Sequence, residues 1–310
     1  FQLWYHVFDL RHNLSVPRWY PSRPPAGYEQ YINDESTSGL YIYAMHPHGI
    51  IPMQGYLWCA FCDQYLEGQY GFGAGTDAVM RLPILRQMLG WLSCGTASRE
   101  VLTHGLTGRG ENLWVSPGGV AEIFLAKPGR NAVMKPRRGL MKLALQTGAC
   151  LIPIYTFGGN DFYHQLATHF DEGEKDDDGG DADTDGDGGG INRTPSSGSF
   201  SSTLGRAQQQ ISRRVRAGFT FWWGRWGTTM PLKSKCSFVL GDPIETVPGT
   251  MGEEYVTGPG GRRRRVCRRV PNPTDEQVEE LMGRYTDALR RLFDQYKAAA
   301  GCPDAELEIH

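Results

Sequence analysis

The chain has 310 residues, of which 40% are hydrophobic and 21% are charged. A chain of this length and composition can bury a large core, so it is neither a disordered segment nor a small disulfide-stapled domain. The net charge of -2 hides an uneven distribution, because ten acidic residues and one lysine lie between Asp171 and Asp187. The rest of the chain is therefore basic, and it suits anionic partners such as phosphorylated cofactors, nucleic acid or a membrane surface.

Residues 1–39 mix aromatic side chains with arginines and prolines. This mixture is typical of a segment at a membrane–water interface. A segment that lies along the surface of the folded domain is an equal alternative. The following stretch, Leu40–Cys62, has no charged side chain, but its histidines, prolines and glycines make it a poor spanning helix. We expect it to be buried or shallowly embedded, and we expect the folded domain to span residues 40–310.

Apolar runs and helical patterns alternate along this domain. The clearest helix begins at Thr274, where the sequence matches a capping box, and a shorter helix around Leu140–Leu145 closes at Gly148. The apolar runs predict strands at residues 40–45, 113–116, 150–157 and 235–240. This order predicts an α/β fold with a mixed, mostly parallel sheet and flanking helices, in which functional residues lie where strands end.

Two stretches do not follow this alternation of apolar runs and helical patterns. Residues 171–210 are rich in Asp, Gly, Ser and Thr, and residues 249–270 are Gly-rich and include six arginines between Arg262 and Arg269. We expect both to be disordered insertions in loops. The arginine run lacks interleaved aromatic residues, so a solvated basic loop that pairs with the acidic insertion is favoured over nucleic-acid binding. No nucleic-acid partner is expected.

The strongest local motif is His46-Pro-His-Gly49, at the end of the first predicted strand. In an extended chain the two histidines lie on one face, while Pro47 stiffens the segment and Gly49 allows a sharp turn. A histidine near neutral pKa is the usual base for removing a proton from an attacking hydroxyl. The alternatives are histidines that satisfy buried backbone groups, and a zinc pair, which lacks a nearby third ligand. We expect no metal.

The second motif, Pro117–Glu122, also follows an apolar strand. Its adjacent glycines, Gly118 and Gly119, can turn successive N–H groups toward an anion, and Glu122 falls one turn into the next helix. A carboxylate in that position can orient a histidine or stabilise its charged form. The alternative is a simple glycine turn followed by a glutamate that favours the helix dipole.

Two further patterns carry less information. Cys59 and Cys62 have the spacing of a redox pair, but they lie in an apolar run and favour core cysteines. Gly71–Thr76 lacks the third glycine of a dinucleotide-binding fingerprint and is expected to be a loop.

Taken together and in order, the motifs resemble the type 2 diacylglycerol acyltransferase family. The resemblance covers about residues 40–163, 219–249 and 271–310, and its Pro-Gly-Gly-Val-x-Glu and arginine-pair blocks look most like plant and algal members. The motifs that carry it are His46–Gly49, Ala97–Arg99, Pro117–Glu122, Arg137–Ala144, Leu151–Gly158 and Val239–Ile244.

The resemblance implies a glycerolipid-acyltransferase-like, membrane-associated fold with a membrane hairpin upstream of residue 1. It implies transfer of a fatty acyl group from acyl-CoA to diacylglycerol, forming triacylglycerol, at the cytosolic face of the endoplasmic reticulum and at lipid droplets. The implied partners are acyl-CoA as co-substrate, diacylglycerol and the membrane surface, with no further cofactor; a homo-oligomer is compatible. Alternatives are a monoacylglycerol or wax-alcohol acyltransferase, or a catalytically silent lipid-binding protein.

Residue by residue, the resemblance implies that His48 is the catalytic histidine and Glu122 the motif glutamate. We also count His46 among the catalytic residues and expect it to shape the turn. We expect His48 to take the proton of the acceptor hydroxyl and Glu122 to orient His48. The oxyanion would be held by backbone N–H groups of Gly118, Gly119 or Gly49. The other residues expected to contact substrate, by phosphate binding or as members of the same motifs, are Arg137, Arg138, Lys142, Pro47 and Arg99.

Overall fold

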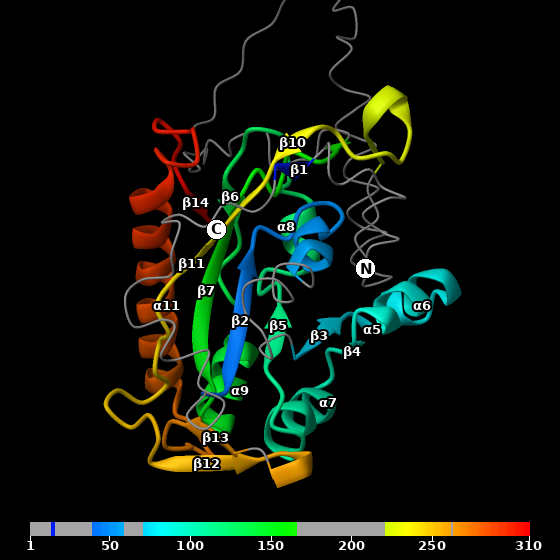
Figure 1. Cartoon of the computed structure of the whole chain (residues 1–310). Coiled ribbons are helices and arrows are strands. Elements are labelled where there is room, and N and C mark those ends of the chain that lie inside the picture. Colours follow the sequence, from blue (N-terminus) through cyan, green and yellow to red (C-terminus); the bar gives the residue numbers. More distant parts are fainter. Residues whose placement is uncertain (1–13, 16–38, 59–70, 166–220, 262) are drawn as a thin grey trace, which may run out of the picture.

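A six-stranded sheet forms the centre of the protein (Figure 1). The structure is a computed structural model that describes residues 14–15, 39–58, 71–165, 221–261 and 263–310. The strands lie in the order β11, β7, β2, β5, β3, β4, and only β11 runs antiparallel to its neighbour. Their bounds are β2 Tyr41–His46, β3 Phe72–Gly75, β4 Cys94–Thr96, β5 Leu113–Val115, β7 Cys150–Phe157 and β11 Ser237–Leu240. The predicted α/β fold with a mixed, mostly parallel sheet is confirmed.

Helices and short strand pairs surround the sheet. The helices are α5 Asp77–Met80, α6 Pro83–Trp91, α7 Arg99–Thr103, η1 His104–Gly108, α8 Val120–Ile123, α9 Arg138–Thr147, η3 Arg225–Gly227, η4 Pro259–Gly261 and α11 Asp275–Tyr296. The pairs are β1 Leu14–Ser15 with β10 Ser234–Lys235, β6 Ala132–Val133 with β14 Glu308–Ile309, β8 His164–Gln165 with β9 Trp222–Trp223, and β12 Glu254–Thr257 with β13 Arg263–Val266.

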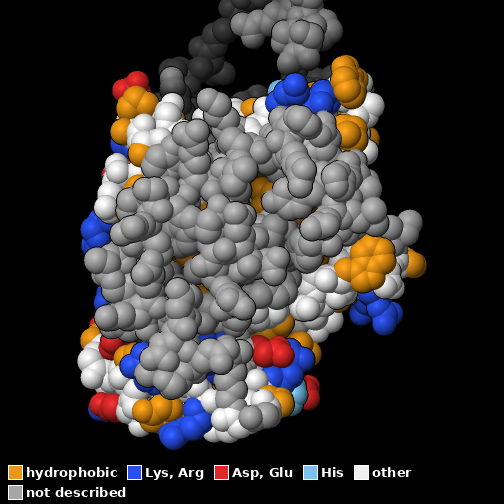
Figure 2. All heavy atoms as spheres, viewed as in Figure 1, with side chains coloured by type: hydrophobic (Ala, Val, Ile, Leu, Met, Phe, Trp, Pro, Cys, Tyr) orange, Lys and Arg blue, Asp and Glu red, His pale blue; other side chains and the backbone are white. Residues whose placement is uncertain are grey.

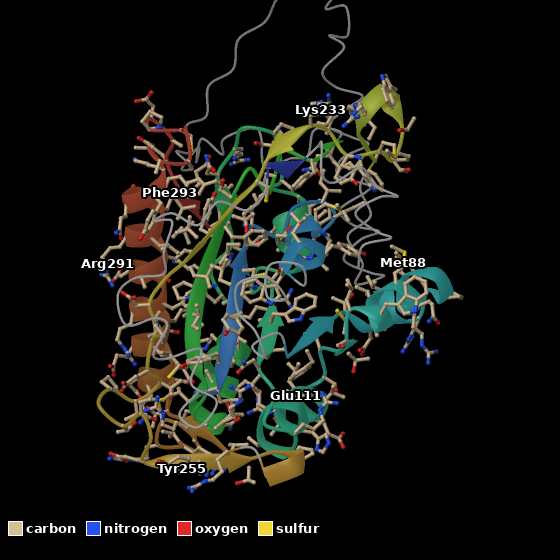
Figure 3. All side chains as sticks on the ribbon, in the orientation of Figure 1. Met88, Glu111, Lys233, Tyr255, Arg291 and Phe293 are labelled. Carbon is tan, nitrogen blue, oxygen red and sulfur yellow. The ribbon has the colours of Figure 1, made fainter. Side chains whose placement is uncertain are left out.

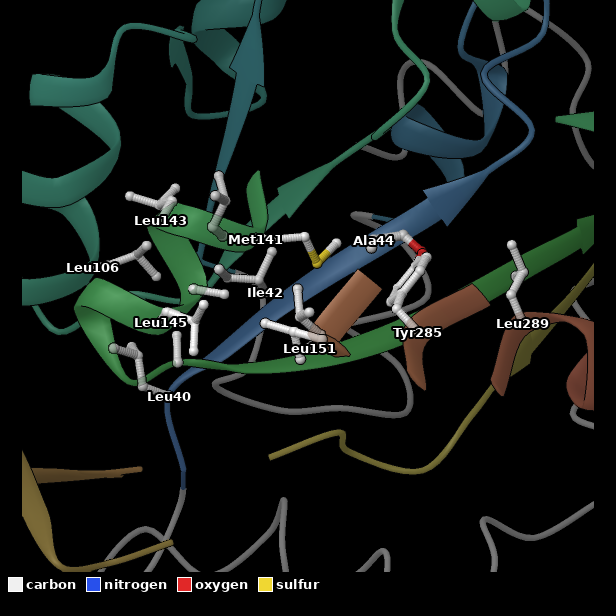
Figure 4. Packing of buried hydrophobic residues seen from close by; sticks show 14 of the residues in the cluster. Leu40, Ile42, Ala44, Leu106, Met141, Leu143, Leu145, Leu151, Tyr285 and Leu289 are labelled. Atoms are coloured by element: carbon white, nitrogen blue, oxygen red, sulfur yellow. The ribbon is translucent and has the colours of Figure 1, made fainter. Parts of the chain in front are cut away.

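Strand β2 lies in the middle of the sheet and is buried on both faces. Successive side chains of a strand point to opposite faces, so Tyr41 and Tyr43 pack in one hydrophobic cluster while Ile42 and Ala44 pack in the other. The second cluster is covered by α9 and α11; Figure 4 shows their side chains, including Tyr285, against β2. The strand that carries the histidine motif is therefore held by packing on both sides.

The strongest local signals of the sequence are confirmed. Helix α11 begins after Thr274, whose side chain and that of Gln277 form the capping box. Helix α9 closes at Gly148, which has φ +70°, a conformation that glycine adopts without strain. The four predicted strands correspond to β2, β5, β7 and the adjoining pair β10 and β11.

The prediction of disorder for residues 249–270 is wrong. These residues contain the antiparallel hairpin of β12 and β13. Composition misled the prediction, because Arg264 is only 2% exposed and the Arg265 carbonyl accepts a hydrogen bond from the Leu40 amide at 2.9 Å. Two other arginines pair with acidic residues of the hairpin region itself: Arg268 with Glu253 at 3.0 Å and Arg269 with Glu254 at 2.6 Å.

Gly71–Thr76, predicted to be a loop, contains strand β3. Its glycines serve close packing, since a Cβ added at Gly73 would lie 2.3 Å from the indole of Trp114. The acidic stretch 171–210, the cysteines Cys59 and Cys62 and nearly all of the N-terminal segment 1–38 lie outside the described residues. Within the described residues, none of the helices combines the length and apolar character needed to span a bilayer.

Candidate active site

Three loops meet at one edge of the sheet, where the parallel strands β2, β5 and β7 end. They are residues 47–49, 117–119 and 158–160. The first and third loops are in contact, because a Cβ added at Gly159 would lie 3.2 Å from the ring of Pro47. The carboxyl edge of a parallel sheet is where ligands bind in such folds, so this junction is the candidate active site.

The buried carboxylate of Glu122 joins the two motifs that the sequence singled out. Glu122 is 1% exposed, and its Oε1 accepts hydrogen bonds from His46 Nδ1–H at 2.8 Å and from the Met134 amide at 2.9 Å. Its Oε2 accepts the amide N–H of His48 at 2.6 Å. A buried carboxylate needs such donors to offset its lost hydration. Glu122 thus fixes the ring of His46 and the backbone of His48.

This arrangement differs from the expectation that Glu122 orients the ring of His48. Strand β2 ends at His46, and Gly49 turns the chain at φ +68°, so the alternation that would place both rings on one face does not continue to His48. The ring that the carboxylate orients is that of His46, which lies fully buried with its centroid 6.1 Å from the Tyr285 ring.

The ring of His48 is partly exposed and carries an available nitrogen. Its Nδ1 lies 2.8 Å from the carbonyl oxygen of Gly49. A carbonyl only accepts, so Nδ1 carries the proton and Nε2 holds a lone pair. Burial lowers the pKa of His48 below 6.5, while the contact with Gly49 and the charge of Glu122 oppose this effect. At neutral pH His48 is therefore an uncharged base.

The lowered pKa predicts how activity depends on pH. Because the pKa of His48 is lowered, the acidic limb of the kcat/KM profile is expected to be centred below pH 6.5. The unfolded chain binds this proton at higher pH than the folded chain, so His48 also makes folding less stable as the pH falls below 6.5. A pH profile of kcat/KM checks this; an acidic limb centred above pH 6.5 would contradict it.

Gln54 is a site residue that sequence reasoning missed. It is fully buried in the helical turn 53–58, and its Nε2 donates to the carbonyl oxygens of Pro47 and, at 2.8 Å, of His48. Gln54 therefore holds the carbonyl groups of the histidine turn, while Glu122 holds the His48 amide. The only sequence signal is a lone glutamine within an apolar segment.

The two glycines of the second motif are required sterically. A Cβ on Gly118 would lie 2.2 Å from the carboxyl carbon of Glu122, and Gly119 has φ +56° and ψ -142°, a region essentially restricted to glycine. The Gly119 N–H donates to the Ser116 carbonyl at 3.1 Å, so it is already engaged and is not free for an oxyanion. Among the described residues, no acceptor is recorded for the N–H groups of Gly118 and Gly49.

The predicted basic residues fall into separate groups. Arg138 pairs with Asp275, at 2.7 Å, and with Glu279, and Lys142 lies 3.5 Å from Asp275. Their charges thus face α11.

Arg137, in contrast, reaches the glycine turn, since a Cβ on Gly119 would lie 3.4 Å from its guanidinium. Arg99 is exposed at the start of α7, after β4. Because β4 is three strand spacings from β2 in the sheet order, Arg99 lies beyond an edge strand roughly 14 Å away from β2. Of these residues, Arg137 is the one that the structure brings to the site.

A cavity of about 130 Å³ borders Pro47. It holds roughly four water volumes, so only a small polar part of a substrate fits. Two lining residues, Thr156 and Asn160, are at most 5% exposed, and Thr156 Oγ1 and Asn160 Oδ1 have no hydrogen-bond partner within the described residues. The wall of the cavity therefore includes two polar residues that each have a buried oxygen without a hydrogen-bond partner among the described residues.

Sequence comparison identifies the family. A model of the diacylglycerol acyltransferase family matches residues 7–176 and 261–310, well over half of the chain. The chain belongs to the diacylglycerol acyltransferase family. Both site motifs, with His48 and Glu122, lie in the first matched segment of this acyltransferase.

Individual relatives of this diacylglycerol acyltransferase family member carry names that agree with the family assignment. The chain is 28% identical to mouse diacylglycerol O-acyltransferase 2-like protein 6, over 96% of this chain and 79% of the relative. It is 29% identical to bovine and 28% identical to human diacylglycerol O-acyltransferase 2, each over 88% of this chain. It spans 66% of the bovine and 61% of the human protein. No solved structure gives a significant match.

Proposed function

We propose that this chain transfers a fatty acyl group from acyl-CoA to the free hydroxyl of diacylglycerol, giving triacylglycerol and free CoA. Family membership supports the reaction class. The observation that carries the proposal is the state of His48: a partly exposed, uncharged imidazole with its Nε2 lone pair available at the carboxyl edge of the sheet.

In the proposed reaction, His48 Nε2 takes the hydroxyl proton while the alcohol oxygen attacks the thioester carbonyl carbon. When the tetrahedral intermediate collapses, the carbon–sulfur bond breaks and the CoA sulfur leaves with the proton held by His48. The negative charge of Glu122 favours the charged imidazole between these two steps. The N–H groups of Gly118 and Gly49 are the candidates to hold the oxyanion.

Substrate contacts follow from the same geometry. Arg137, over the glycine turn, is the candidate for a CoA phosphate, because a guanidinium binds phosphate with two hydrogen bonds. The cavity beside Pro47 suits the glycerol hydroxyl region of the acceptor. The reaction needs no cofactor other than acyl-CoA itself. Its lipid substrates place the enzyme at a membrane, and we propose the cytosolic face of the endoplasmic reticulum and lipid droplets.

The acceptor is tested by giving the purified full chain oleoyl-CoA together with diacylglycerol, monoacylglycerol or a long-chain alcohol. We expect diacylglycerol-dependent release of free CoA, with triacylglycerol identified by thin-layer chromatography. Faster release with one of the other acceptors would reassign the substrate within the family. No release from folded protein with any acceptor would instead support a catalytically silent lipid-binding protein.

A further inference from the structure

Residues 221–227, called the aromatic turn below, expose an unusual amount of apolar surface. Trp226 is 80% exposed, Phe221 66% and Trp223 37%. Large exposed apolar groups that cluster in this way mark interaction sites. Figure 2 shows hydrophobic and basic side chains together at the upper right, where Figure 1 draws the hairpin around η3 in yellow.

The exposure of Trp226 is built into the backbone. Trp226 has φ +56° and ψ +26°, the left-handed region that is uncommon for a bulky residue. The turn is closed by hydrogen bonds from the Gly224 amide to Thr228 O at 2.6 Å and from the Arg225 amide to Met230 O at 2.7 Å. Trp226 is thus a strained residue at the tip of an ordered turn, and its indole is exposed to solvent. Backbone strain of this kind is found most often at functional positions.

The segment that contains the turn has charged residues of one sign. Residues 221–241 include one arginine and two lysines but no Asp or Glu. The Arg225 guanidinium lies 5.4 Å from the Trp226 ring centroid. Tryptophan beside arginine and lysine suits the boundary between lipid headgroups and acyl chains. A two-fold contact with a second copy would instead bring the same positive charges face to face.

The aromatic turn lies at the same edge of the sheet as the histidine motif. The segment after it is fastened to the loop that follows β7, through the Leu232 amide to Phe162 O at 2.8 Å and Ser234 Oγ to Gly158 O at 3.2 Å. Gly158 lines the cavity that borders Pro47. In Figure 3, Lys233 marks this end of the molecule and Tyr255 marks the opposite end.

We propose that the aromatic turn inserts into an anionic phospholipid surface, so that the carboxyl edge of the sheet, with His48, faces the lipid phase that holds the acceptor. The role of that lipid as the source of acceptor rests on the proposed function. The insertion itself rests on the exposed aromatic residues, the strained tip and the local positive charge.

The test compares two variants of the full chain for binding to phosphatidylcholine vesicles with and without phosphatidylserine. Trp226→Gly removes the indole and relieves the left-handed strain, so its melting temperature should not fall. Vesicle binding should weaken by about tenfold or more, because an indole buries a large apolar area in the interface. The matched control is Tyr255→Ala, at the other end of the molecule. Tyr255 is 42% exposed, and the Arg263 guanidinium carbon lies 4.1 Å from the centroid of its ring. It should bind vesicles like the wild type.

Equal binding by Trp226→Gly and the wild type, or an equal loss in Tyr255→Ala, would overturn the proposal. So would a change in oligomeric state in Trp226→Gly with vesicle binding unchanged, since the occupant of the turn would then be a second copy. Acyl transfer to diacylglycerol in detergent micelles is measured alongside. Trp226→Gly should keep that activity, whereas absence of transfer in the wild type would refute the proposed function and leave the vesicle result standing.

Discussion

Replacing His48 by alanine is expected to lower the rate of acyl transfer by about 100-fold or more, the usual contribution of a positioned general base. The variant loses an imidazole nitrogen at the carboxyl edge that is partly exposed and carries no proton, because Nδ1 holds the ring proton. Its fold should survive, because the ring donates a single hydrogen bond, to the adjacent Gly49 carbonyl. The measurement is the initial rate of diacylglycerol-dependent CoA release, with the melting temperature recorded on the same sample.

His46→Ala is the matched comparison. His46 is fully buried and donates to Glu122, so its loss should lower the melting temperature, unlike the loss of His48. If His48→Ala kept full activity while a folded His46→Ala lost it, the base would be His46 and the proposed assignment would fail.

Replacing Glu122 by alanine is expected to lower the free energy of unfolding by about 3 kcal/mol or more, since each buried donor left without an acceptor costs about 1–3 kcal/mol. Three donors depend on this carboxylate: His46 Nδ1–H and the amides of His48 and Met134. Urea unfolding gives the free energy. Activity should fall as well, because the backbone that carries His48 loses its anchor.

Two further variants separate charge from packing. Glu122→Gln keeps the shape and one accepting oxygen, so it should be more stable than Glu122→Ala while its rate of transfer stays low. Glu111→Gln is the control: Glu111 is 43% exposed and pairs with Arg109 at 2.9 Å, so its loss should change stability by less than about 1 kcal/mol. Equal stability of Glu122→Ala and Glu111→Gln would contradict the anchoring role.

The elements that could be predicted from the sequence are those specified locally. The capping box at Thr274 and the glycine after α9 act through neighbouring residues, so their effects are visible in a short window. The β12–β13 hairpin is specified by distant partners: Arg265 bonds to Leu40, and Arg264 is buried against Gly39. Composition alone made that segment look disordered.

The same limit applies to the site. The histidine and glycine motifs could be recognised, and so could their meeting at the carboxyl edge of the sheet. Which histidine ring Glu122 holds depends on where β2 ends and how Gly49 turns, and neither follows from spacing. Arg138 and Lys142 were expected to bind phosphate, but Asp275, 137 residues away along the chain from Arg138, faces them.

Strands β8 and β9 lie on either side of residues 166–220 in the chain, yet they are hydrogen-bonded neighbours, with Gln165 opposite Trp222. The two ends of that segment are thus held next to each other. Lengthening a connection whose ends are already joined adds little closure entropy, about 0.6 kcal/mol for each doubling of its length. Changes in the length of that segment therefore do not alter the order of the sheet strands or the position of His48. Its length can vary during evolution while the site is kept.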